Sequence, residues 1–187
     1  MAHRLQKENP LPDPNRPTLT APEFAVQYMK GVSDRCREFQ FLLGEWSVEI
    51  ARHSNDGGEP LLFRGVWLAE ALFEGRMICD RFTAFVPDGP AVSSTVTLRT
   101  WCEATESWEM TFLASGQPNR LDSFTGRKVG GEMHLEAKGL DLLGRPVEAK
   151  VRFFDIHDDR FTWDQRSRLA NGDRWYLDST MRAKRVA

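Results

Sequence analysis

The chain has 187 residues, a formal net charge of −2 and three cysteines. This length is typical of a single domain with a substantial hydrophobic core. Because acidic and basic residues are interspersed, no basic surface is indicated for nucleic acid or an anionic membrane, and we expect neither partner. The polar N-terminus and the lack of an apolar run of roughly 20 residues predict neither a signal peptide nor a transmembrane helix, so we expect a cytoplasmic protein.

The residue types that carry metal or cofactor chemistry form no recognised pattern. Cys36, Cys79 and Cys102 are widely spaced, which favours reduced thiols over a disulfide framework. No cysteine and histidine cluster has zinc-ligand spacing, and the four histidines lie far apart. A nucleophile elbow, a phosphate-binding glycine loop, a dinucleotide fingerprint and a His-Glu-x-x-His motif are all missing. We therefore expect no metal site and no cofactor.

Residues 1–20 are predicted to form a proline-rich arm, because proline resists helix formation and favours extended structure. The remaining residues, 21–187, are predicted to form one domain. That domain consists of a helix over residues 21–38 and a β-barrel over residues 39–187. The prolines of the arm are Pro10, Pro12, Pro14 and Pro17.

The helix is indicated by its start signals and its apolar spacing. Thr20 is a typical N-cap, Pro22 suits a first turn, and Glu23 completes a capping box. Apolar side chains then recur every four residues, which predicts an amphipathic helix that needs an apolar partner. We expect it to cover one end of the barrel, either as a fixed cap or as a lid over a ligand. The recurring residues are Phe24, Tyr28, Val32 and Cys36.

From residue 45 onward, segments rich in Val, Thr, Phe and Trp alternate with turn signals. Ten short strands joined by tight turns favour a closed antiparallel up-and-down barrel, because closure removes exposed sheet edges. A helix-plus-curved-sheet cone is the alternative, but that fold requires several N-terminal helices. The strands are expected at residues 45–54, 61–72, 76–86, 91–102, 107–115, 121–128, 131–138, 145–156, 160–169 and 174–185.

Three stretches carry a resemblance to a known family. They are Phe41-Leu42-Leu43-Gly44-Glu45-Trp46; Leu98-Arg99-Thr100-Trp101 leading through Ala104-Thr105 to Trp108; and Trp163-Asp164-Gln165 followed by Asn171-Gly172-Asp173 and Trp175. Over about residues 39–185 the chain resembles a bacterial family of uncharacterised lipocalin-like (calycin) β-barrel proteins, distantly similar to fatty-acid-binding-protein-like barrels. The resemblance implies a barrel and little about chemistry. After Trp101 the family usually has Asp-Pro, where this chain has Cys102-Glu103.

Related nitrite- and haem-binding barrels have a Gly-x-Trp-x-Gly-x-Gly signature and an axial histidine. Here Trp46 is followed by Ser47-Val48-Glu49-Ile50, so the resemblance does not extend to a haem site.

Turn lengths predict which side chains share the barrel lumen, because residues opposed in a hairpin lie on one face of the sheet. Trp108 and Met110 belong to the apolar phase of their strand, so we expect their partners to face inward as well. This arrangement predicts an aromatic lumen face that carries a diagonal pair of Asp80 and Arg99. The expected opposed pairs are Trp101 and Trp108, Arg99 and Met110, Thr97 and Phe112, Trp67 and Phe82, Ala69 and Asp80, Asp80 and Thr97, and Ile78 and Arg99.

Two interpretations of Asp80 and Arg99 remain open at this stage. A buried arginine is costly unless it is paired, so the two residues can form a structural pair that fixes the strand register. Alternatively, the guanidinium anchors an anion or a carbonyl, and Asp80 acts as a general acid or base.

A second set of candidates lies near the C-terminus. Trp163, Gln165 and Ser167 share one side of their strand, where Gln165 is either a core amide or a group that orients a ligand. An even loop after Arg152 would place that residue opposite Gln165, whereas an odd loop would place it outside the barrel. His157 is expected to be a solvated loop histidine. The expected partners of Trp163, Gln165 and Ser167 are Met181, Ser179 and Leu177.

Many aromatic side chains together with a few convergent polar groups are typical of a ligand pocket in a barrel. Our first hypothesis is a barrel that binds a small, largely apolar or aromatic molecule with an anionic or carbonyl group. The alternatives are a cofactor-independent isomerase, cyclase or lyase, and a ligand-free filled barrel that forms a homodimer through its arm and helix. The candidate catalytic residues are Asp80 and Arg99, and the candidate ligand-binding residues are Trp67, Phe82, Trp101, Trp108, Met110, Arg152, Trp163 and Gln165.

Overall fold

The computed structural model describes residues 20–54, 57–116, 123–140 and 144–186. The predicted arm therefore lies outside the described residues, and the division into an arm and one domain remains a prediction. Three short helical segments precede the strands: the α-helix α1 (Ala21–Met29) and the 3-10 helices η1 (Asp34–Arg37) and η2 (Gln40–Leu42). The strands are β1 (Gly44–Arg52), β2 (Leu61–Leu72), β3 (Met77–Phe85), β4 (Ala91–Cys102), β5 (Ser107–Ala114), β6 (Phe124–Val129), β7 (Glu132–Leu140), β8 (Pro146–Phe154), β9 (Arg160–Leu169) and β10 (Tyr176–Arg185).

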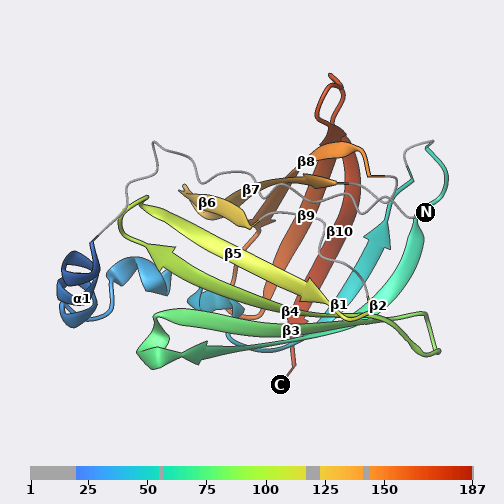
Figure 1. The fold of residues 1–187 in the computed structure, drawn as a ribbon. Helices are drawn as coiled ribbons and strands as arrows, with labels where there is room; N and C mark the ends of the chain where they lie inside the picture. The colour runs from blue at the N-terminus through green and yellow to red at the C-terminus, as the bar shows by residue number, and fades with distance from the viewer. Residues whose placement is uncertain (1–19, 55–56, 117–122, 141–143, 187) are drawn as a thin grey trace, which may run out of the picture.

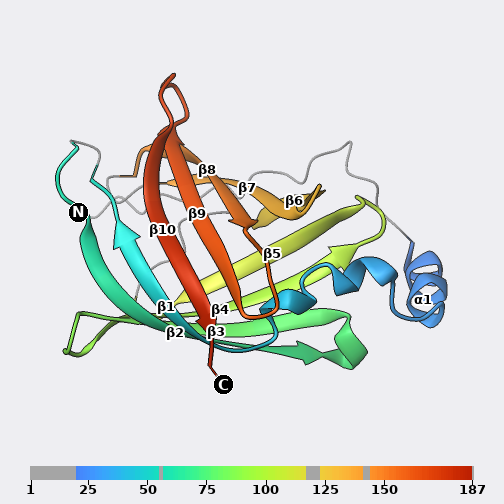
Figure 2. The same cartoon turned by 180° about the vertical axis from the view of Figure 1, so that it is seen from behind.

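The ten strands form a closed antiparallel barrel in which each strand pairs with its neighbours in sequence and β1 pairs with β10 (Figure 1). This architecture confirms the predicted up-and-down barrel, and the strands lie close to their expected positions. Figure 2 shows the closing seam from the other side, where β9, β10, β1 and β2 run side by side. Among the described residues, no helix is long and apolar enough to cross a bilayer.

The alternation of side chains explains the inner and outer surfaces of the barrel. In β1, Trp46, Val48 and Ile50 are buried, whereas the intervening Ser47 and Glu49 are exposed. This two-residue period places apolar groups in the lumen and polar groups in water. All seven opposed pairs expected for the hairpins β2–β3, β3–β4 and β4–β5 are present.

One expected pairing in the C-terminal hairpin is wrong. Met181 and Ser179 lie opposite Trp163 and Gln165, as expected, but the register shifts between Leu177 and Ser179. Leu177 therefore lies opposite Arg166 rather than Ser167. The cause is a β-bulge, which inserts one extra residue into β10.

The predicted helix over residues 21–38 is also wrong in length and position. α1 begins with the expected capping box at Thr20 but ends at Met29, and Gly31 has a φ of 98°. Tyr28 and Val32 remain 52% and 38% exposed, and the side chain of Phe24 lies outside the described part of the structure. Helix α1 lies beside the barrel (Figure 1). It is held there by Arg76, whose guanidinium lies 4.1 Å from the Tyr28 ring centroid and donates a hydrogen bond to the carbonyl of Gly31.

The end of the barrel is closed by the segment after the helix instead. Phe39 and Leu42 are fully buried, and Phe39 packs edge-on against Trp108 and Phe153 with centroid distances of 4.8 and 5.5 Å. Trp46 Nε1 donates to the carbonyl of Leu42 at 2.7 Å. Because these contacts combine apolar burial with a buried hydrogen bond, η1 and η2 form the cap that the sequence predicted for the longer helix.

We expect Phe39→Ala to lower the free energy of unfolding by about 3–5 kcal/mol, because it removes a fully buried ring from the barrel end. Met29→Ala is the matched control, since Met29 is 76% exposed and its truncation should change stability by no more than about 0.5 kcal/mol. Urea unfolding measures both values. Equal losses for the two variants would contradict the assignment of the cap.

A second stability test concerns the close approach of β6 to β7. A Cβ at Gly126 would overlap with the carbonyl oxygen of His134 and lie 2.7 Å from the Cα of Leu135. Gly126→Ala must therefore displace backbone, and we expect a loss of about 1–3 kcal/mol in urea unfolding. Gly131→Ala is the control, because a Cβ there meets no atom within 4 Å. A loss at Gly131 as large as that at Gly126 would contradict the packing described here.

Candidate functional site

The barrel lumen contains a cavity of about 130 Å³ with a mainly aromatic and apolar wall. An apolar cavity of roughly 150 Å³ is large enough to bind benzene, so this volume suits about one aromatic ring. The cavity brings together side chains of β2 to β6 and β8 to β10, from Trp67 to Met181. Seven of the ten predicted site residues line it: Trp67, Asp80, Phe82, Arg99, Met110, Trp163 and Gln165.

A fully buried ion pair forms part of the cavity wall. Arg99 and Asp80 are 2% and 1% exposed, and Arg99 Nη1 contacts Asp80 Oδ2. The two residues are diagonal neighbours on β3 and β4, because Asp80 lies directly opposite Thr97 and Arg99 lies directly opposite Ile78. Trp67 Nε1 donates to the other carboxylate oxygen, Asp80 Oδ1, at 2.8 Å. Both oxygens of Asp80 are therefore engaged by neighbouring donors.

Aromatic rings surround the guanidinium of Arg99. Its Cζ lies 5.4 Å from the ring centroid of Phe39 and 5.9 Å from those of Trp67 and Phe153, within cation–π range. Burial lowers the pKa of Arg99 to about 9, against a smaller effect of Cys79 in the opposite direction. The guanidinium thus remains charged at neutral pH. Among the described residues, Arg99 Nε has no hydrogen-bond partner.

A second polar group lines the cavity from β9. Gln165 Nε2 donates to Asp178 Oδ2 at 2.9 Å and to Ser167 Oγ at 3.4 Å. Asp178 is the extra residue of the β10 bulge, and its other oxygen lies 3.8 Å from Arg52 Nη2. Ser179 lies opposite Gln165, and its buried Oγ has no partner in the described part of the chain. The sequence contains no signal for this bulge, so Asp178 was not predicted.

Two predicted tryptophans lie at the closed end of the barrel instead of lining the cavity. Trp108 is fully buried against Phe39, and its Nε1 donates to Glu38 Oε2 at 3.0 Å. Trp101 packs edge-on against Trp108 at a centroid distance of 6.2 Å, and the guanidinium of Arg35 lies 5.9 Å from its ring. Both rings contact the cap or its neighbours, so their position indicates a packing role.

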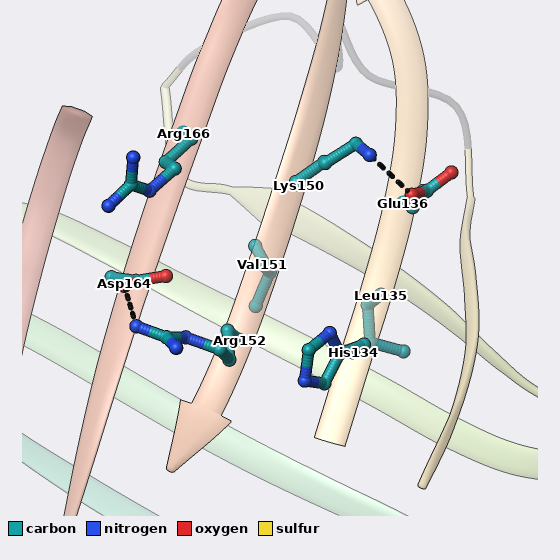
Figure 3. A pocket seen from close by; sticks show the side chains of 8 residues that line it. All are labelled: His134, Leu135, Glu136, Lys150, Val151, Arg152, Asp164 and Arg166. Carbon is teal, nitrogen blue, oxygen red and sulfur yellow. Dashed lines mark hydrogen bonds and ion pairs between the residues drawn. The ribbon is translucent and has the colours of Figure 1, made fainter. Parts of the chain in front are cut away.

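Arg152 lies on the outer face of the barrel, so of the two loop parities that the sequence leaves open the structure has the odd one, and Arg152 does not line the lumen as a candidate ligand-binding residue would. It pairs with Asp164, whereas Val151 lies opposite Gln165, so the loop between β8 and β9 is of the odd kind. Arg152 Nη2 donates to Asp164 Oδ2 at 2.8 Å in an external groove of about 270 Å³ (Figure 3). His157 is a loop residue, as expected, and its Nε2 lies 2.9 Å from Asp155 Oδ1.

Two ion pairs lie in the outer groove. Besides Arg152 and Asp164, it contains Lys150 and Glu136, whose Nζ and Oε1 atoms lie 3.0 Å apart (Figure 3). The pair of Lys150 and Glu136 is exposed and contributes little to stability, whereas Asp164 is buried beneath Arg152. The strands β7, β8 and β9 thus present charged groups outside, whereas Gln165 is a polar group of β9 on the lumen side.

No protein-family model and no curated protein matches this sequence. Solved structures are nevertheless similar in fold. Rv2717c from M. tuberculosis has a TM-score of 0.61 and 14% identity over 84% of this chain and 100% of that chain. The S-type phycobiliprotein lyase CPES from Guillardia theta has a TM-score of 0.58 and 10% identity over 80% of this chain and 90% of that chain. At these identities the similarity concerns the fold alone, and with the ten-strand barrel it is consistent with a calycin-like barrel.

Replacing one member of the buried pair of Asp80 and Arg99, and then the second, should change the free energy of unfolding in opposite directions. Asp80→Asn keeps an acceptor for Trp67 Nε1 but leaves Arg99 charged and unpaired, so we expect a loss of about 3–5 kcal/mol in the free energy of unfolding. Adding Arg99→Met should recover most of that loss, because it removes the uncompensated charge.

The exposed Glu136, which pairs with Lys150, is the surface control for this measurement. Glu136→Gln should cost no more than about 1 kcal/mol. A double variant of Asp80 and Arg99 that is less stable than Asp80→Asn alone would contradict the pairing.

Proposed function

We propose that this protein binds a small, largely apolar or aromatic molecule with an anionic or carbonyl group inside its barrel. The observation that carries the proposal is the lumen cavity, whose aromatic wall contains a buried guanidinium with an unpaired Nε–H. A few polar groups in an apolar concave site are typical of small-molecule pockets. In this proposal Trp67, Phe82, Met110 and Trp163 contact the apolar part of the ligand. Arg99 and Gln165 contact its polar groups.

The size of the cavity limits the ligand to a compact molecule. Pockets for drug-sized ligands have volumes of roughly 300–1,000 Å³, whereas this cavity has about 130 Å³. A single ring with small substituents therefore fits the lumen better than a long acyl chain. We further propose that the chain belongs to the lipocalin-like family that its motifs resemble, with a cytoplasmic location and without nucleic-acid or membrane partners.

The cofactor-independent enzyme remains the second candidate, because Asp80 borders the same cavity and because one barrel of similar fold is a lyase. The contacts of Asp80 argue against a free general base, since Trp67 and Arg99 occupy both carboxylate oxygens. The filled barrel that self-associates as a homodimer is the third candidate. The small volume of the cavity supports this filled barrel, and calorimetric titration with small ligands distinguishes it from a ligand-binding protein.

Calorimetric titration with one-ring carbonyl compounds and their carboxylate analogues tests the proposal, with a long-chain fatty acid as the size control. We expect saturable binding of at least one one-ring probe and weaker or no binding of the fatty acid. Thr95→Phe should abolish that binding, because Thr95 lines the cavity and a ring there would fill it. Val96→Phe is the matched control, since the adjacent Val96 is 42% exposed and faces outward.

Two outcomes would contradict the proposed function. The first is that no probe binds, which would favour the filled barrel. The second is that Thr95→Phe binds the probe as tightly as the wild-type protein, which would place the binding outside the lumen.

A further inference from the structure

We infer that the lumen site selects an uncharged ligand that accepts a hydrogen bond at one position and donates one at another. Such a ligand is a small cyclic or aromatic molecule with a carbonyl facing Arg99 and a hydroxyl or N–H group facing Gln165. The inference rests on the proposed function and narrows its ligand class, because it excludes the carboxylate that the sequence left open.

The charge of the ligand follows from the pairing of Arg99. Its positive charge is already balanced by Asp80, and both side chains are essentially inaccessible to water. A bound carboxylate would leave one uncompensated negative charge among aromatic side chains, which is costly in an apolar environment. A neutral carbonyl adds no charge and can accept the unpartnered Nε–H of Arg99. The site therefore favours a neutral acceptor.

The donor on the ligand follows from the orientation of Gln165. A carboxylate can only accept hydrogen bonds, so the contact with Asp178 Oδ2 requires the NH₂ group of Gln165 on that side. Ser167 Oγ contacts the same nitrogen. These contacts leave the amide oxygen as the group that Gln165 can offer to the cavity that it lines. An oxygen acceptor needs a donor on the ligand.

The bulge in β10 fixes this orientation. Because Asp178 is an extra residue in the strand, its carboxylate reaches Gln165 although the regular partner of Gln165 is Ser179. The buried Oγ of Ser179, which has no partner among the residues that the structure describes, adds a second polar group on the same face of the sheet. Arg99 on β4 can thus supply a donor and Gln165 on β9 an acceptor to a cavity whose wall also contains aromatic side chains.

Three probes of nearly equal size test the two parts of the inference by calorimetry at about pH 6. 4-Hydroxyacetophenone is neutral and has both groups, 4-hydroxybenzoate carries a carboxylate, and 4-methylacetophenone lacks the donor. We expect 4-hydroxyacetophenone to bind at least about tenfold more tightly than either of the other two. 4-Hydroxybenzoate would bury an uncompensated negative charge, and 4-methylacetophenone would leave the amide oxygen of Gln165 without a donor.

Gln165→Met isolates the contribution of the amide. This variant should bind 4-hydroxyacetophenone no more tightly than 4-methylacetophenone, while the affinity for 4-methylacetophenone stays within about twofold of the wild-type value. Arg152→Met is the control on the outer face and should leave all three affinities unchanged. If Gln165→Met does not fold, the ranking of the three probes on the wild-type protein still decides the inference.

The outcomes separate this inference from the proposed function. Equal or tighter binding of 4-hydroxybenzoate would overturn the neutral-ligand inference and leave lumen binding intact. Equal binding of 4-hydroxyacetophenone and 4-methylacetophenone would overturn the role of Gln165. If none of these three probes binds, and none of the other one-ring carbonyl compounds and carboxylate analogues of the titration binds, both the inference and the proposed function are wrong.

Discussion

The buried pair of Asp80 and Arg99 is the interaction on which the lumen depends. Each group is costly to remove from water, and each is tolerated only because the other lies beside it. That contact requires β3 and β4 to be in one register, since a shift by one residue would send one of the charges to the outer face. Trp67 Nε1 extends the same requirement to β2 through its hydrogen bond to Asp80. The pair therefore fixes three strands and leaves a lumen without net charge.

Clear turn signals explain why this half of the site could be predicted from the sequence. A turn centred on recognisable residues sets which side chains oppose one another, and the alternation in the strand then determines their face. The connections β3–β4 and β8–β9 both span five residues, but only the first contains proline and glycine to mark the centre of the turn. The sequence therefore does not decide the parity of the β8–β9 loop or the side of the sheet on which Arg152 lies. The bulge at Asp178 was not predictable either, because it depends on contacts with β1 and β9 rather than on local sequence.

Position along the barrel axis is a further quantity that alternation does not determine. Trp101 and Trp108 share one face of the sheet as expected, yet they lie at the closed end rather than beside the cavity. Trp108 lies against Glu38 and Phe39, and Trp101 lies against Trp108 and Arg35. The predicted helix failed for a related reason. The apolar spacing continues through Gly31, whose φ of 98° ends the helical path, and the buried cap is formed by Phe39 and Leu42. Periodicity indicated that an apolar segment would cover the barrel, and tertiary contacts decided which segment does.

A neutral lumen in which Arg99 Nε–H has no partner among the described residues differs chemically from the anion site that an isolated arginine would provide. The most direct measurement of this difference is the NMR signal of the Arg99 Nε–H group in labelled protein, with and without a saturating neutral carbonyl probe. We expect a signal protected from solvent exchange that moves downfield when the carbonyl binds, because Nε–H gains its first acceptor. A protected signal that stays in place at saturation, or that moves only with a carboxylate, would contradict the central claim.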